Sequence, residues 1–108
     1  MVIETTGMPE ERPRALLLSS EFPPGPGGIG HHAFQLAKNL TQLGWDIHVL
    51  APQPYVSAAE RDAFNHRQPF AVTSLPERDM DGNWRTERMR VINGAMRAMR
   101  PSLLIATG

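Results

Sequence analysis

The chain has 108 residues, 41% of them hydrophobic, and its 11 Lys and Arg residues balance 11 Asp and Glu residues. This length predicts one domain with a small core, and the zero net charge argues against a nucleic-acid partner, which would require a strongly basic domain. The absence of cysteine excludes disulfides and thiolate metal sites. No apolar run approaches the ~20 residues that a membrane span needs. The absence of cysteine fits a cytoplasmic protein, which is what we expect.

The N-terminal segment is polar and contains proline. It has neither the basic start nor the apolar run of a signal peptide. We therefore expect a disordered lead-in over residues 1–13 and a folded domain over residues 14–108.

Short apolar runs bounded by Gly or Pro alternate with helical patterns along the rest of the chain. We expect four strands, over residues 15–19, 46–51, 70–75 and 102–106. We expect three helices, from His31 to a stop at Gly44, from a capping box at Ser57 and Glu60 through about Asn65, and over residues 84–99. The last helix has an apolar stripe of methionine and isoleucine, namely Met89, Ile92, Met96 and Met99.

This alternation predicts the fold class. It is typical of an α/β, Rossmann-like three-layer sandwich in which helices cover a parallel sheet of about four strands. The chain ends in an apolar run that reads as a strand, so we expect these residues to be part of a longer protein.

A glycine-rich loop connects the first strand to the first helix, and it is the most informative segment. Residues 21–32 read Glu-Phe-Pro-Pro-Gly-Pro-Gly-Gly-Ile-Gly-His-His. A strand, a glycine turn and a helix start can present free backbone N–H groups to an anion. A plain connector would not need the conformational freedom of Gly27, Gly28 and Gly30.

Three polar side chains flank this loop. Glu21 follows the first strand, where functional groups concentrate in α/β folds, so it is a candidate substrate contact; a solvated carboxylate is the alternative. His31 and His32 point about 100° apart on a helix and are not expected to form a metal site. We consider them candidate contacts to substrate, with solvation as the alternative.

Residues 25–30 also match the dinucleotide-binding pattern G-x-G-x-x-G by letter. However, Glu-Phe-Pro-Pro separates the strand from the first glycine, and no acidic residue ends the second expected strand. We therefore disfavour an NAD-binding oxidoreductase.

Residues 17–52 resemble the opening of the retaining, nucleotide-sugar-dependent glycosyltransferases of the GT-B fold, the family 4-like group with glycogen synthases and mannosyltransferases. The resemblance rests on Ser-Glu-Phe-Pro-Pro at 20–24, Gly-Gly-Ile-Gly-His-His at 27–32, Leu-Ala-Lys-Asn-Leu at 36–40 and the run 43–52.

The resemblance implies transfer of a sugar from a nucleoside diphosphate sugar to an acceptor with retention of configuration, without a metal or another cofactor. It implies that Gly27, Gly28, Ile29 and Gly30 face a phosphate of the donor or an anionic part of the acceptor. The donor-binding C-terminal domain would lie outside these residues, which would supply the acceptor side, hold no catalytic residue and be inactive alone.

The implied partners are the nucleotide-sugar donor and a carbohydrate or lipid-linked acceptor. Arginines on the last expected helix could dock it on a membrane surface, although a solvated helix face is the favoured interpretation. A small standalone module that binds a nucleotide or a phosphorylated ligand without catalysis is the alternative function.

Overall fold

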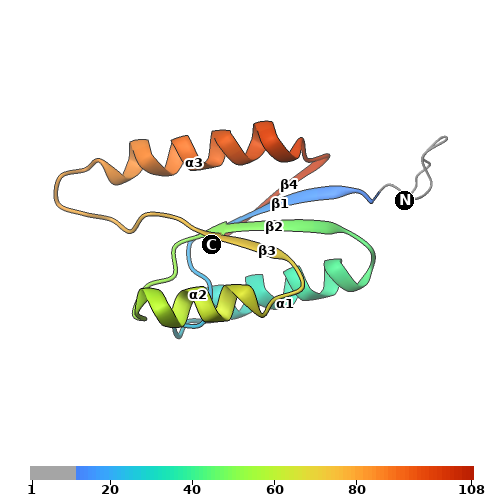
Figure 1. Ribbon diagram of the computed structural model, residues 1–108, viewed down its shortest axis with the longest axis horizontal. Coiled ribbons are helices and arrows are strands. Elements are labelled where there is room, and N and C mark those ends of the chain that lie inside the picture. The colour runs from blue at the N-terminus through green and yellow to red at the C-terminus, as the bar shows by residue number, and fades with distance from the viewer. Residues whose placement is uncertain (1–11) are drawn as a thin grey trace.

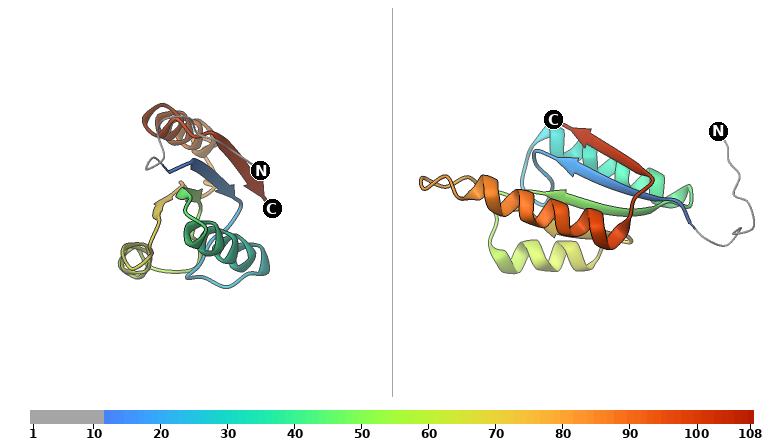
Figure 2. Two further views of the ribbon diagram at one scale, coloured as in Figure 1. Left: turned by 90° about the vertical axis from the view of Figure 1, so that its right-hand side faces the viewer. Right: turned by 90° about the horizontal axis from the view of Figure 1, so that it is seen from above.

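The computed structural model describes residues 12–108 and shows an α/β sandwich of three layers. Four parallel strands, β1 (Arg14–Ser19), β2 (Asp46–Ala51), β3 (Ala71–Ser74) and β4 (Leu103–Thr107), form one sheet in the order β3-β2-β1-β4. Helices α1 (Gly28–Gln42) and α2 (Ala58–His66) cover one face, and α3 (Trp84–Met99) covers the other (Figures 1 and 2). The predicted fold class is confirmed.

The apolar run of β1 is buried on both faces of the sheet. Ala15 and Leu17 pack in the core beneath α1, whereas Leu16 lies in the core beneath α3, and all three are 0% exposed. A central strand of a parallel sheet loses water on both sides, which explains why this run does not alternate with polar residues.

Four phenylalanines join the α1 and α2 side of the core into one aromatic cluster. Phe22, Phe34, Phe64 and Phe70 have ring centroids 5.7 to 6.3 Å apart, most of them in edge-to-face arrangements. Phe22 belongs to the loop after β1 and is only 1% exposed. Its burial anchors that loop to the helices.

Helix α1 begins three residues earlier than the sequence indicates. Its N-cap is Gly27, whose φ of 140° strongly favours glycine, and Gly28, Ile29 and Gly30 form its first turn. Glycine at position 30 allows the helix to pack closely against the loop after β1. A Cβ at this position would lie only 3.1 Å from the backbone of Phe22. The predicted stop at Gly44 is confirmed, with a φ of 100°.

The other helices show one confirmed feature and one difference. The capping box of α2 is present, because Glu60 N donates to Ser57 Oγ and Ser57 N to Glu60 Oε1, both at 3.1 Å. On α3, in contrast, Met89 and Met96 are exposed. The residues that pack on the sheet lie along a shifted stripe, namely Val91, Ile92, Ala95 and Met99.

We expect a lead-in over residues 1–13, and residues 1–11 of this segment lie outside the described residues. The carbonyl oxygen of Pro13 already accepts a hydrogen bond from Asp46 N at 2.8 Å, next to the start of β1. Within residues 12–108, no helix has the length and apolar character to cross a membrane.

Candidate functional site

A pocket of about 340 Å³ lies at the carboxyl edge of the sheet. Its lining comes from the segments that follow β1, β2 and β3 and from one side chain of α3, namely Ser20, Glu21, Pro52, Pro54, Tyr55, Glu77, Arg78 and Arg88. Open α/β sheets bind ligands outside the carboxyl ends of their strands. The volume is at the lower end of the range for small-molecule sites, so the pocket suits a compact ligand.

Glu21 connects this pocket to the glycine turn. Its Oε1 accepts a hydrogen bond from Gly30 N at 3.1 Å, and a Cβ at Gly27 would overlap the same carboxylate. The positive end of the α1 dipole favours a negative charge at this point. The chain's own carboxylate therefore satisfies one of the amides that the sequence assigns to an external anion.

Two amides of the turn stay available. Among the described residues, the N–H groups of Gly28 and Ile29 have no hydrogen-bond acceptor. A Cβ at Gly28 would meet no atom within 4 Å, so the space in front of this residue is open. A ligand oxygen could therefore approach the first turn of α1 beside Glu21.

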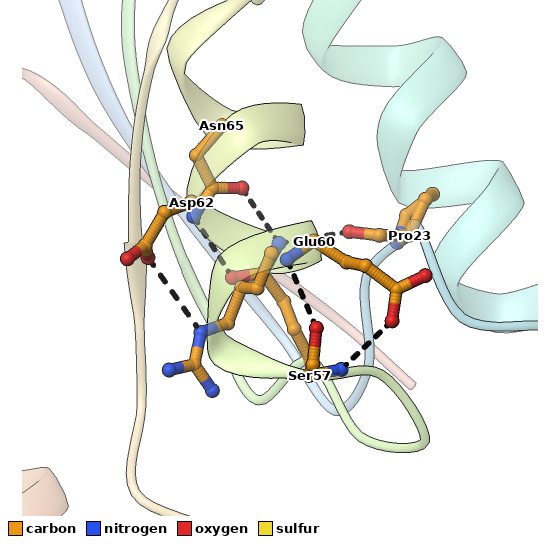
Figure 3. A network of polar contacts seen from close by, with 7 residues as sticks. Pro23, Ser57, Glu60, Asp62 and Asn65 are labelled. Atoms are coloured by element: carbon orange, nitrogen blue, oxygen red, sulfur yellow. Dashed lines mark hydrogen bonds and ion pairs between the residues drawn. The ribbon is translucent and has the colours of Figure 1, made fainter.

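A buried amide pair holds the loops around the pocket in place. Gln53, 0% exposed, donates from Nε2 to the carbonyl oxygen of Pro23 at 2.8 Å and to Asn65 Oδ1 at 2.7 Å. Asn65 Nδ2 donates back to Gln53 Oε1 at 3.0 Å, and Figure 3 shows this network between α2 and the loop at Pro23. The segments after β1 and β2 are thus tied to one helix.

The positive charge near the pocket comes from arginine side chains that pack around the indole of Trp84. The Cζ atoms of Arg88, Arg85 and Arg78 lie 4.6, 4.7 and 5.4 Å from the centroid of the Trp84 ring. Arg88 Nε also donates to the carbonyl oxygen of Pro76 at 2.6 Å. The ring contact and the Nε hydrogen bond therefore hold the side chain of Arg88, which lines the pocket.

The charge on Arg88 is only partly compensated within the described part of the chain. Burial lowers the pKa of Arg88, the nearby Arg78 lowers it further, and Glu77 opposes this with a smaller effect. No carboxylate of residues 12–108 forms an ion pair with Arg78 or Arg88. Two guanidinium groups thus face the pocket with their charge available to a ligand.

Tyr55 lies at the rim of the pocket in a strained conformation. Its φ is 70°, a left-handed backbone that a bulky residue rarely adopts, and its side chain is 83% exposed. Such strain costs about 1 to 3 kcal/mol and clusters at functional sites. The strain places an exposed aromatic ring beside the arginines and Glu21.

The structure brings only some of the predicted site residues to the pocket. Glu21 lines the pocket. The turn from Gly27 to Gly30 contacts the carboxylate of Glu21 but is not itself part of the pocket lining. His31 and His32 are exposed in the first part of α1, are not part of the pocket lining, and their rings make no hydrogen bond to a described residue. Their contact with substrate stays a prediction.

The sequence alone does not identify Tyr55, Arg78 or Arg88 as site residues. The position of Tyr55 and Arg78 after the carboxyl ends of β2 and β3 is a signal that could have identified them. No comparable signal distinguishes Arg88 from the other arginines of α3. Within residues 12–108, no group of three side chains could hold a metal ion.

No protein-family model, curated protein or solved structure matches this chain.

Proposed function

We propose that this chain is the acceptor-side, N-terminal domain of a retaining GT-B glycosyltransferase that uses a nucleoside diphosphate sugar. The observation that carries the proposal is the position of Glu21, which lines the pocket and also contacts the first turn of α1. A carboxylate for sugar hydroxyls and open amides for a phosphate are thereby adjacent. The resemblance of residues 17–52 to this enzyme group supports the same function.

The chemical task of this half of the enzyme is to position and to stabilise. Glu21 can accept hydrogen bonds from acceptor hydroxyls, and the Gly28 and Ile29 amides can donate to an oxygen of the departing diphosphate. The dipole of α1 favours the charge that develops there. Under this proposal the donor-binding groups belong to a C-terminal domain outside these residues, and this chain alone does not catalyse transfer.

The test uses the complete gene product with UDP-glucose, ADP-glucose and GDP-mannose and a panel of sugar acceptors. We expect transfer from one donor, with retention at the anomeric carbon detected by NMR of the product. The variant Gly28→Val should lose at least tenfold in kcat/KM, because the added side chain fills the space where the ligand approaches.

Gly94→Val is the matched control. Gly94 lies on α3, a Cβ at this position also meets no atom within 4 Å, and the residue is not part of the pocket lining. The kcat/KM of this variant should equal that of the wild type. No transfer from any donor, an inverted product, or full activity of Gly28→Val would overturn the proposal.

The alternative function, a standalone module for a nucleotide or phosphorylated ligand, is favoured by the same open amides and unpaired arginines. It predicts micromolar binding of UDP or ATP to the 108-residue chain and no transfer by the complete gene product. The glycosyltransferase proposal predicts that nucleotide affinity comes mainly from the other domain, so these residues alone should bind UDP weakly.

A further inference from the structure

We propose that the pocket binds a phosphorylated sugar or polyol, with the phosphate held by Arg78 and Arg88 and the hydroxyls by Glu21. This inference rests on the proposed function and names the class of acceptor that the site takes. It also assigns a binding role to two arginines that lie away from the glycine turn.

The charges of Arg78 and Arg88 indicate that the pocket favours an anion. Arg78 and Arg88 lie close enough to repel each other, and neither forms an ion pair with a carboxylate of residues 12–108. Glu77 offsets part of this repulsion, but less than Arg78 adds to it. Guanidinium groups bind phosphate oxygens through charge-assisted, often bidentate hydrogen bonds, so a dianionic phosphate would relieve the repulsion.

Glu21 decides where the phosphate lies within the pocket. Its carboxylate is fixed at the first turn of α1, and within the pocket its negative charge makes the arginines the more favourable place for a phosphate that does not reach the open amides of that turn. Glu21 forms no ion pair with Arg78 or Arg88, and Glu77, which also lines the pocket, offsets the charge near Arg88 only in part. A ligand that carries both hydroxyl groups and a phosphate can therefore use the Glu21 carboxylate and the two guanidinium groups at once.

Trp84 and Tyr55 complete the site. Three guanidinium groups lie within 5.4 Å of the centroid of the indole, and these cation–π contacts stabilise the positions of Arg78 and Arg88. The Tyr55 ring is exposed at the rim and can cover the apolar face of a sugar ring. A bare phosphate would leave Tyr55 and Glu21 unused.

The experiment titrates the 108-residue chain with glucose 6-phosphate, glucose and inorganic phosphate, and follows backbone amide signals by NMR. We expect glucose 6-phosphate to bind at least tenfold more tightly than either other probe and to shift the signals of Glu21, Tyr55 and Arg78. Equal affinity for glucose would overturn the role of the arginines. Equal affinity for inorganic phosphate would overturn the role of Glu21 and Tyr55.

Substitutions identify the groups that hold the phosphate. Arg88→Gln and Arg78→Gln should each weaken glucose 6-phosphate at least tenfold. Arg90→Gln is the matched control, because Arg90 lies on the same helix, is exposed and pairs with Glu87; its affinity should not change. If Arg88→Gln fails to fold because it loses the Pro76 contact, the exposed Arg78 still tests the proposal. Unchanged affinity in Arg78→Gln would overturn it.

A second arm distinguishes a soluble ligand from a lipid headgroup with the same chemistry. Sedimentation with vesicles of phosphatidylcholine, with and without phosphatidylglycerol, measures attachment to a polyol phosphate on a surface. Arginine-dependent attachment to the phosphatidylglycerol vesicles, competed by glucose 6-phosphate, assigns the site to a lipid-linked acceptor. Binding of glucose 6-phosphate without attachment assigns it to a soluble one; each outcome supports the phosphate site.

The failure of this inference can be distinguished from failure of the proposed function. If the complete gene product transfers sugar only to uncharged acceptors, with full activity in Arg78→Gln, the phosphate site is overturned and the glycosyltransferase remains. If glucose 6-phosphate binds through the arginines but no donor supports transfer, the phosphate site remains and the proposed function is overturned.

Discussion

The carboxylate of Glu21 accepts a hydrogen bond from the backbone N–H of Gly30 at 3.1 Å, across the N-terminus of α1. The contact joins the loop after β1 to the first turn of the helix and places a negative charge at the positive end of the helix dipole. It also brings Glu21 to the wall of the pocket. One residue thus stabilises the helix start and supplies a polar group to the candidate site.

This relationship predicts a loss of stability in Glu21→Ala. Removal of a charged acceptor at a helix N-terminus should lower the free energy of unfolding by about 1 kcal/mol in urea denaturation at neutral pH. Asp81→Ala is the control, because Asp81 is exposed and forms no hydrogen bond or ion pair with a described residue. Equal stability of both variants would show that the Gly30 contact contributes nothing.

The pair of Gln53 and Asn65 predicts a larger loss. Gln53→Leu removes three amide hydrogen bonds from a fully buried position and leaves the carbonyl of Pro23 and the Asn65 amide without these partners. We expect a decrease of about 2 to 3 kcal/mol in the free energy of unfolding, measured in urea. The exposed Gln42→Leu should change it by less than about 0.5 kcal/mol.

A double-mutant cycle separates the pair from its surroundings. Gln53→Leu with Asn65→Leu should cost less than the sum of the two single changes, because each single change removes both hydrogen bonds between the two amides and leaves polar atoms of the other amide without that partner. Simple additivity would contradict the hydrogen-bonded pair.

The element order follows from patterns that are local in the sequence. The apolar run of β1, the stop at Gly44 and the Ser57 and Glu60 capping box each specify an element through its own residues, and all are present. The start of α1 is not local in this sense. It depends on how closely Gly30 packs against the backbone of Phe22, a contact that requires the folded loop.

The candidate site is less predictable for the same reason. Glu21 follows directly from its place after β1, but the pocket forms only when three separate segments and α3 come together. The shifted stripe of α3 exposes Met89 and brings Arg88 to the pocket. A shift of the helix by a fraction of a turn decides which arginine lies there, and spacing alone does not resolve it.

Two helical glycines predict changes of opposite sign. Gly94→Ala should raise the free energy of unfolding by about 1 kcal/mol, because the position is inside α3 and its Cβ would meet no atom within 4 Å.

Gly30→Ala should lower the free energy of unfolding by about 1 to 3 kcal/mol, since the Cβ would lie 3.1 Å from Phe22 backbone atoms that cannot move cheaply. Thermal and urea unfolding of both variants measure this; stabilisation by both would contradict the close packing at Gly30.

His48 predicts how stability depends on pH. Burial lowers the pKa of His48 below 6.5, opposed in part by Asp46, and its Nε2 lies 2.8 Å from Thr73 Oγ1. The folded state therefore favours the neutral ring: its contribution is complete above about pH 6.5 and is lost as the pH falls from there through the lowered folded-state pKa. His48→Gln keeps an uncharged donor near Thr73, so the free energy of unfolding should fall less between about pH 7 and about pH 5 than it does in the wild type. For one proton, the slope of the wild-type fall stays below about 1.4 kcal/mol per pH unit. His66→Gln, at an exposed position, is the control and should show the same decrease in the free energy of unfolding as the wild type in urea titrations across this range. An equal decrease in His48→Gln would show that the His48 ring does not cause it.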